Sequence, residues 1–265
     1  MAAIDPMHQF MITKIVDIPP VVVPGLGVID LSITNSVATM LGAATLITVF
    51  FLAAGRGAVV PGRMQAMGET LYDLIDKGLT GSMIGDRGRP FMPFVFTLFM
   101  FIAVLNLIGL FPKQFTVTSQ LAVTVALAVM TFLLVLIVGF AKNGIGFFKL
   151  FVPSGVAWPM LFILVPIGFS SFLVRPVTLA MRLVGNFIGG PVVMYMFGAF
   201  VAGLGGFAIA NGGLAYLGLV GSALSLSMVI ALMALEFIVA FLQAFVFAAL
   251  TCTYLSDVVN LDHGH

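Results

Sequence analysis

The sequence predicts an all-α integral membrane protein with about five membrane helices and one amphipathic interfacial helix, the last two membrane helices being long and steeply tilted. Hydrophobic residues make up 61% of the 265 residues and charged residues only 8%, with a mean hydropathy of +1.21. Soluble domains carry about 25% charged residues, so this much apolar surface needs lipid as its solvent. Apolar runs of about 20 residues recur without strict alternation, which favours helices over a barrel.

One membrane domain, 1–265, contains all of the expected elements. Residues 61–81 mix polar and apolar side chains, with Leu71 and Ile75 at helical spacing opposite Asp73 and Lys77, which is typical of an interfacial helix. In chain order we expect an N-terminal segment (1–35), a first span (36–54), the interfacial helix (61–81), a helical hairpin (91–140) and two long helices (158–204 and 214–255).

The two apolar stretches nearest the C-terminus are too long for upright membrane spans. Residues 158–204, if helical throughout, would reach roughly 70 Å at 1.5 Å per residue, against a hydrocarbon core of about 30 Å. The stretch 214–255 is again too long, and a glycine-rich link joins the two. We therefore expect a steeply tilted antiparallel pair; the alternative is two ordinary spans, each broken at a glycine or proline.

Basic residues in the loops predict the orientation of the chain. The first and third connections are rich in them, whereas Lys14 and Lys113 stand alone on the opposite side. The positive-inside rule then places the N-terminus outside and the C-terminus in the cytoplasm. A net charge of +1, spread along the chain, argues against nucleic acid as a partner. The basic residues of the two crowded connections are Arg56, Arg63, Lys77, Arg87, Arg89, Lys142 and Lys149.

Two charged residues, Arg182 and Glu236, lie deep inside apolar stretches. A buried charge in lipid costs several kcal/mol or more, and such residues usually face a polar path or a partner. An ion pair between the two is the structural alternative. Function is favoured, because an arginine stays charged at ordinary pH and would be a costly choice for packing alone.

The spacing of polar residues around these charges defines two helix faces. Arg175, Thr178, Arg182 and Asn186 follow steps of three, four and four, and therefore share one face. In the final helix, Glu236 and Gln243 likewise share a face with Ala240 and Phe247. An apolar setting disfavours the charged form of a carboxyl, which suits a proton relay; a protonated glutamate bonded to a neighbouring helix is the structural alternative.

The sequence offers no sign of a metal centre, a cofactor or covalent catalysis. His8, His263 and His265 lie in the tails, without cysteine or carboxylate companions at ligand spacing. A phosphate-binding loop and a nucleophile elbow are both lacking. We therefore predict a non-catalytic protein that needs no cofactor.

Residues 175–190, RPVTLAMRLVGNFIGG, and residues 236–255, EFIVAFLQAFVFAALTCTYL, resemble the last two helices of subunit a of F-type ATP synthases. Arginine and asparagine in an RLxGN context, followed some sixty residues later by glutamine in an aromatic, alanine-rich helix, form a demanding pattern. DPMHQF at 5–10 and NLIGLFP at 106–112 resemble the alphaproteobacterial and mitochondrial-like branch of this family. The resemblance covers nearly the whole chain.

The resemblance implies roles for the residues of the two polar faces. Arg182 corresponds to the stator arginine, Asn186 and Gln243 to polar neighbours of the proton path, and Glu236 to the ionisable position of the inlet half-channel. On the outlet side, the lining of relatives corresponds to Arg175, Thr178 and Ser171.

Three positions depart from the pattern of the family. Pro191 stands where many members have a glutamate or histidine that pairs with the residue at Glu236, so the inlet is expected to rely on Glu236, Gln243, water and His8. Gly109 replaces an acidic residue of some relatives. Gly168 stands where some bacterial members carry a glutamate, which weakens the assignment of the outlet lining.

The resemblance implies a proton-conducting stator subunit in a bacterial inner membrane, with two offset half-channels that couple proton flow to ATP synthesis. The implied partners are the c-ring, the peripheral-stalk b subunits, the remainder of the ATP synthase and the lipid bilayer. Sodium stays open as the ion, because the ion site of this family lies on the c subunit. A proton-coupled transporter that binds an anionic solute through Arg182 is the alternative, against which stand the missing inverted repeat and the missing second polar cluster.

Overall fold

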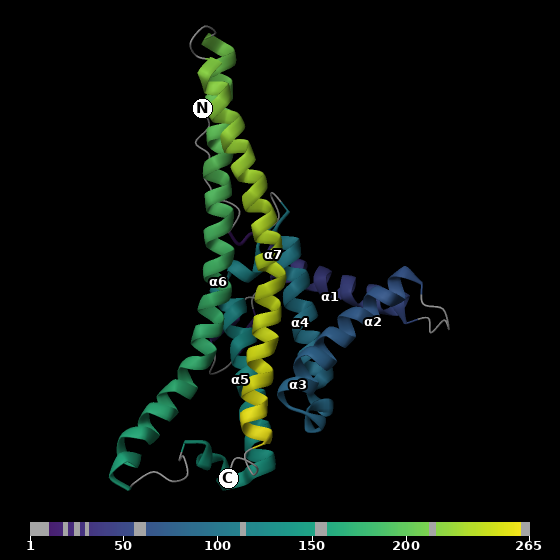
Figure 1. The fold of residues 1–265 in the computed structure, drawn as a ribbon, viewed down its shortest axis with the longest axis vertical. Coiled ribbons are helices and arrows are strands. Elements are labelled where there is room, and N and C mark those ends of the chain that lie inside the picture. The colour runs from purple at the N-terminus through teal and green to yellow at the C-terminus, as the bar shows by residue number, and fades with distance from the viewer. Residues whose placement is uncertain are drawn as a thin grey trace. The chain divides into compact units, whose positions relative to one another are not determined.

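The computed structural model describes residues 11–17, 21–23, 27–29, 32–55, 62–111, 115–151, 158–211 and 216–260. In that part of the chain, five helices are long and apolar enough to cross a membrane, so the predicted all-α membrane fold is confirmed (Figure 1). His8 and the tail histidines lie outside the described residues. The five helices are α1 (Asn35–Ala54), α4 (Met92–Gly109), α5 (Leu121–Asn143), α6 (Trp158–Asn211) and α7 (Leu217–Val259).

Four short strands precede α1, which the sequence analysis did not foresee. Strand β1 (Lys14–Val16) pairs antiparallel with β4 (Ile33–Thr34), and β2 (Val21–Val23) pairs antiparallel with β3 (Gly27–Ile29). The valines and isoleucines of this segment are β-branched and suit a pleated strand better than a helix. Their short runs between prolines carry little periodicity, so the pattern alone did not predict the strands.

The interfacial segment consists of α2 (Arg63–Ile75), a π-helical turn (Asp76–Thr80) and α3 (Gly81–Met83). Ile75 and Leu79 are buried on one side. On the exposed side Lys77 donates a hydrogen bond of 2.6 Å to Asp73, and this bond raises the pKa of Lys77. A 3₁₀ helix (Asp86–Phe91) then leads into α4.

The long helices α6 and α7 are continuous. Pro159, Pro166, Pro176 and Pro191 lie within α6 and do not end it. At 1.5 Å per residue, the 54 residues of α6 extend about 80 Å and the 43 residues of α7 about 65 Å. The alternative of ordinary spans broken at a glycine or proline does not hold, because both helices run without a break. Both are longer than a hydrocarbon core of about 30 Å, and their tilt in the membrane stays a prediction.

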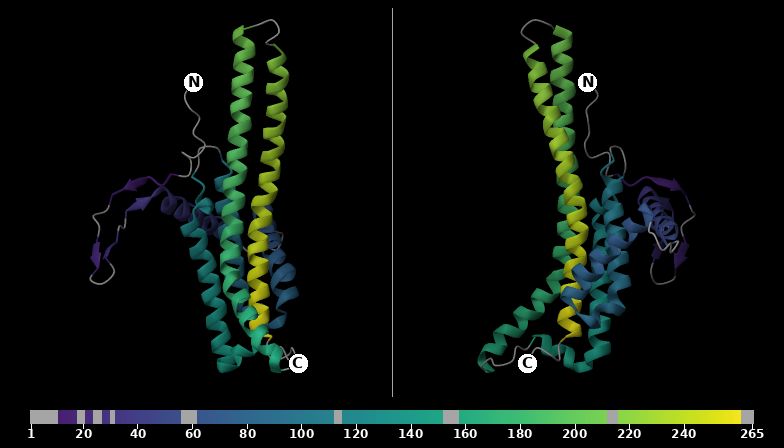
Figure 2. Two further views of the ribbon diagram at one scale, coloured as in Figure 1. Left: turned by 90° about the vertical axis from the view of Figure 1, so that its left-hand side faces the viewer. Right: turned by 45° about the vertical axis from the view of Figure 1, so that its right-hand side comes forward.

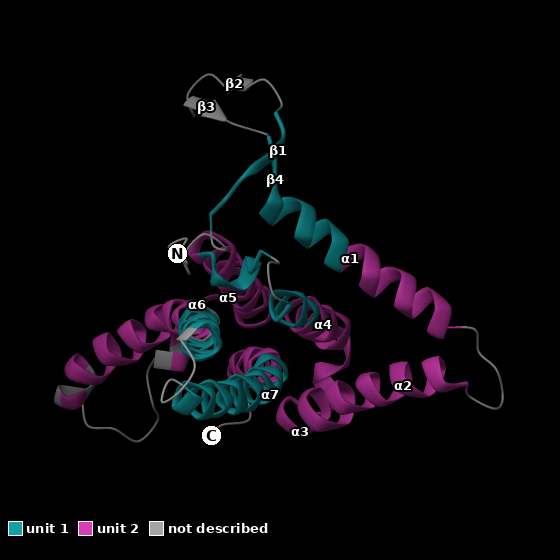
Figure 3. Ribbon diagram, turned by 90° about the horizontal axis from the view of Figure 1, so that it is seen from above, with its two compact units in different colours: residues 1–43, 104–120, 184–242 teal, residues 44–103, 121–183, 243–265 magenta. Residues whose placement is uncertain are grey.

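The chain divides into two compact units (Figure 3). Unit 1 contains 1–43, 104–120 and 184–242, and unit 2 contains 44–103, 121–183 and 243–265. Both long helices contribute to each unit: α6 passes from unit 2 into unit 1 after Leu183, and α7 returns to unit 2 after Leu242.

In unit 1 the C-terminal part of α6 packs antiparallel against the N-terminal part of α7. The Ser222 hydroxyl donates a hydrogen bond of 3.0 Å to the Val201 carbonyl. A Cβ at Gly218 would lie 2.9 Å from the carbonyl oxygen of Leu204, so glycine is needed for this close approach of two backbones. The two helices run side by side in both views of Figure 2.

In unit 2 the C-terminal end of α7 is held by polar side chains to two other elements. Asn143 of α5 donates to the Val258 carbonyl at 2.8 Å. Ser256 donates to the Met83 carbonyl at 2.7 Å, and Asn260 donates to the Ile84 carbonyl at 3.3 Å. These bonds fix the last turn of α7 to α5 and to the end of α3.

Candidate functional site

Arg182 lies on α6 in unit 2 and is exposed, whereas its neighbours Leu179 and Leu183 are buried. Among the described residues of its own unit, none forms an ion pair or a hydrogen bond with the guanidinium. Its one recorded electrostatic partner there is Tyr254 of α7. A fixed positive charge on an apolar helix without a counter-ion in its own unit needs a polar path or a partner chain.

Glu236 lies on α7 in unit 1 and is half-buried. Its Oε1 atom is buried and has no hydrogen-bond partner within the described part of the chain. The carboxyl packs directly on the backbone of Gly190, and a Cβ at that position would collide with Oε1. The next residue of α6 is Pro191, so neither position 190 nor position 191 offers Glu236 an ionisable side chain.

Asn106 is a candidate that the sequence analysis did not single out. It lies in the unit 1 part of α4, is fully buried and donates a hydrogen bond of 3.0 Å to the Ala240 carbonyl, one turn after Glu236 on α7. Its Oδ1 atom is buried and accepts no hydrogen bond from any described residue. An asparagine inside the apolar run 91–111 was the sequence signal that could have identified it.

Gln243 and Asn186 complete the residues expected near the inlet. Gln243 lies on α7 in unit 2 and is buried, with 6% of its surface exposed. Asn186 lies on α6 in unit 1, but its side chain lies outside the described part of the structure. Gly109 packs against Thr116, whose Cγ2 would lie 3.0 Å from an added Cβ.

Arg175 makes the most contacts of the predicted site residues. Its Nη1 atom forms an ion pair with Oδ2 of Asp257 at 3.1 Å. The guanidinium also lies over the ring of Tyr254, 4.5 Å from its centroid, and 5.3 Å from that of Phe172. The sequence analysis missed Asp257 because it ended the last helix at Leu255, whereas α7 continues to Val259.

Ser171 and Thr178 are exposed on α6 in unit 2. The Thr178 hydroxyl donates to the Arg175 carbonyl at 2.8 Å. Both side chains line an open hollow that Arg175 and Tyr254 also border. Unit 2 therefore brings together three of the residues predicted for the outlet: Ser171, Arg175 and Thr178.

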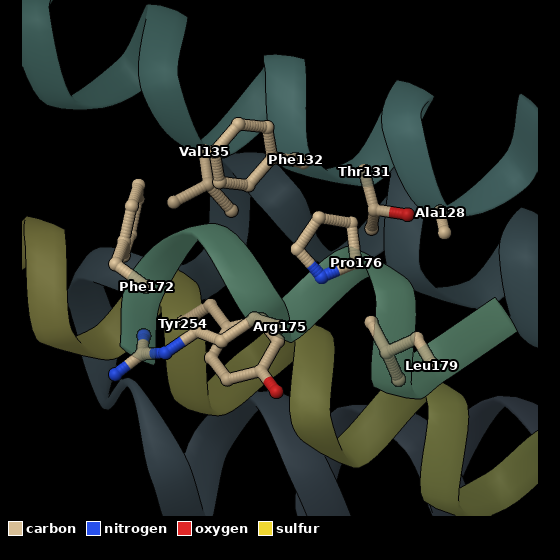
Figure 4. A pocket seen from close by; sticks show the side chains of 9 residues that line it. All are labelled: Ala128, Thr131, Phe132, Val135, Phe172, Arg175, Pro176, Leu179 and Tyr254. Carbon is tan, nitrogen blue, oxygen red and sulfur yellow. The ribbon is translucent and has the colours of Figure 1, made fainter. Parts of the chain in front are cut away.

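A second, much smaller hollow lies behind Arg175, between α5, α6 and α7 of unit 2 (Figure 4). Its volume is about 10 Å³, close to the least that one water molecule needs. Thr131 and Phe132 of α5 line it opposite Pro176 and Leu179 of α6. Arg175 thus lines both the small hollow between the helices and the open hollow that Ser171 and Thr178 border.

The sequence model of the family described as ATP synthase A chain matches residues 37–256. The chain belongs to this family. Curated members named ATP synthase subunit a are similar to it over nearly their full lengths. The protein of Rhodopseudomonas palustris strain TIE-1 is 46% identical over 261 residues, 98% of this chain and 100% of the relative. Those of Hyphomonas neptunium and Mesorhizobium japonicum are 46% and 43% identical, with 98% of both chains covered in each case.

Membership of the ATP synthase A chain family confirms the resemblance that the two C-terminal motifs predicted. Both motifs, 175–190 and 236–255, lie within the matched range of 37–256. The relatives are alphaproteobacterial proteins, as the N-terminal DPMHQF segment suggested. The roles of single residues in this chain are not part of that match and rest on the geometry described above.

Proposed function

We propose that this chain is the proton-conducting stator subunit of an F-type ATP synthase, a non-catalytic subunit that provides two offset half-channels to and from a rotating c-ring. Membership of the ATP synthase A chain family carries the proposal. Two observations on the described residues support it: the Arg182 guanidinium has no ion pair or hydrogen bond there within its own unit, and Oε1 of Glu236 has no hydrogen-bond partner. Both groups are costly in an apolar helix unless they serve a polar path.

Protons enter from the outer side past Glu236. Asn106 and Gln243 lie on or against the same face of α7, and Asn186 lies on α6. The Oδ1 atom of Asn106 accepts no bond within the described part of the chain, so it offers an acceptor for water beside Ala240. Bare backbone at Gly190 leaves the Glu236 carboxyl to exchange its proton with water rather than with a paired side chain.

Arg182 separates the two half-channels. Its permanent charge favours the ionised form of a ring carboxyl that arrives opposite it, and therefore favours proton release. The same charge repels protons that would cross directly between the half-channels. Each proton that moves through the full membrane potential releases about 2.3 kcal/mol per 100 mV. The synthesis of one ATP therefore needs the free energy of several protons.

Protons leave to the cytoplasm through the hollow bordered by Ser171, Arg175 and Thr178. The basic connections support an N-terminus outside and a C-terminus inside a bacterial inner membrane. The c-ring faces Arg182, and the peripheral-stalk b subunits join the chain to the soluble head. No cofactor or nucleic acid takes part.

The substitution Arg182→Ala tests the proposal. We expect it to abolish ATP-driven proton pumping, measured as acidification of inverted membrane vesicles, and to permit passive proton flow through the membrane sector. Arg63→Ala, which removes an exposed arginine of α2, is the matched control and should pump normally. Normal coupled pumping by Arg182→Ala would remove the role assigned to this residue.

A proton-coupled transporter of an anionic solute is the second candidate, because Arg182 has no counter-ion among the described residues of its own unit. Purification of the chain from membranes distinguishes the two. A transporter purifies alone or as a homo-oligomer, whereas a stator subunit brings with it a small hairpin protein in many copies.

A further inference from the structure

The ion pair between Arg175 and Asp257 differs from the other ion pairs of the described residues. Those others join side chains three or four positions apart, such as Lys77 with Asp73, and are largely exposed. The Arg175–Asp257 pair instead joins two long helices, and its side chains are only 27% and 34% exposed. It ties the unit 2 part of α6 to the last turn of α7.

The negative charge of Asp257 is unfavourable at its position unless a cation lies beside it. It lies in the last turn of α7, which ends at Val259, and the dipole of a helix disfavours negative charge at its C-terminus. Arg175 supplies the compensating charge at 3.1 Å. The carboxylate is therefore stable in this place because of a residue that lies on a different helix.

The C-terminal end of α7 is held in place by hydrogen bonds to other elements of unit 2. Hydrogen bonds from Asn143, Ser256 and Asn260 join this end to α5 and to the turn after α3. Arg175 of α6 meets this end through two partners, the Asp257 carboxylate and the ring of Tyr254. A planar guanidinium that serves two partners at once is restricted in its orientation.

The position of Arg175 bears directly on Arg182. The two arginines lie two turns apart on the same face of α6, and both act electrostatically on Tyr254. A contact that fixes the rotation of α6 at Arg175 therefore also fixes the direction in which Arg182 projects.

We propose that the Arg175–Asp257 ion pair, seated on Tyr254, is a latch that positions the Arg182 segment of α6 against α7. Arg175 and Asp257 are then positioning residues rather than carriers of protons. The inference rests on the proposed function, since it assigns the latch to keeping Arg182 in register while the ring turns past it.

The latch predicts that losing both charges is no worse than losing one, because either loss breaks the same contact. Arg175→Met leaves the Asp257 carboxylate unpaired at the helix end, and Asp257→Asn leaves the guanidinium without its counter-ion. The double variant removes the same contact without stranding a charge. We expect each single variant to lower ATP-driven pumping, per assembled complex, by about fivefold or more, and the double variant to pump no more slowly than the worse single variant, instead of showing the product of the two losses.

Passive proton leak through the same complexes is the readout that a merely structural role would not move. A loosened Arg182 separates the half-channels less well, so both single variants and the double variant should leak more than the wild type at equal assembly. Losses that multiply in the double variant, or variants that pump slowly without leaking, would overturn the latch.

Arg182→Ala is run in parallel to separate the two proposals. If Arg182→Ala abolishes pumping and the losses of the two single variants multiply in the double variant, the latch is wrong and the proposed function stands. If Arg182→Ala pumps normally, the proposed function fails, whatever the latch variants do.

Discussion

At the scale of single residues, the contact between Gly190 and Glu236 decides how the carboxyl can work. Oε1 lies so close to the backbone of Gly190 that no side chain fits between them. The carboxyl is half-exposed, and its Oε1 atom has no hydrogen-bond partner among the described residues. At position 190 it therefore meets backbone rather than a side chain.

We predict that Gly190→Ala slows proton uptake by displacing the Glu236 carboxyl. The expected loss in the rate of ATP-driven pumping is about tenfold, which corresponds to about 1.4 kcal/mol on the barrier. Glu236→Gln, which removes the titrating group, should be slower still. Gly198→Ala, at a position where a Cβ meets no atom within 4 Å, is the control. Unchanged proton conductance in Glu236→Gln would instead support a purely structural glutamate.

The sequence singled out Arg182 and Glu236 because a charge in an apolar run is visible without a structure. It could not pair Arg175 with Asp257, since these residues lie 82 positions apart and their meeting depends on how two helices pack. Asn106 and Tyr254 were missed for a related reason. Asn106 is a polar residue within an apolar run and could have been noticed, but only its neighbours in space, like those of Tyr254, give it a role.

At the scale of helices, the end of α5 is packed too tightly to accept a larger residue. A Cβ at Gly139 would lie 2.6 Å from the ring of Phe147 and 3.0 Å from Cγ1 of Val258. Phe147 has little freedom to move, because it is buried and its ring packs at a tilt against Phe140 and edge-on against Phe172. This junction joins α5, the 3₁₀ helix Gly144–Phe151 and the end of α7.

Gly139→Ala is therefore expected to destabilise unit 2 by about 1–3 kcal/mol, the usual range for overpacking a core. A lower midpoint of thermal aggregation of the purified complex would show this. Gly42→Ala, at a position of α1 with no atom within 4 Å of the added Cβ, should leave the midpoint unchanged. Equal midpoints for the two variants would contradict the packing described here.

Hydrophobic run length was sufficient to predict the membrane helices and the two over-long ones. The helix ends were harder to predict from the sequence. In α7, Ser256 and Asp257 look like the start of a polar tail. They continue the helix because Asn143, Met83 and Arg175 supply partners from elsewhere in the chain. The N-terminal strands were missed because two or three residues are too few to show a period.

At the scale of the whole molecule, the chain supplies only one side of a proton path. Its deep polar groups are split between the two units, with Glu236 and Asn106 in unit 1 and Arg182 and Arg175 in unit 2. The proposed passage from one group to the other runs through carboxyls that a different subunit carries. Sequence and family membership could predict that this chain and another subunit share the proton path. The packing of single side chains could be described only from the structure.

Passive proton flux through vesicles that contain this chain and its ring is the most direct test of the central claim. Flux driven by an imposed potential should require both components. Covalent blocking of one ring carboxyl, which stops rotation, should end the flux when Arg182 is present and leave it running in Arg182→Ala, because protons then cross directly. Flux that persists without this chain, or that the block ends equally in both proteins, would contradict the account.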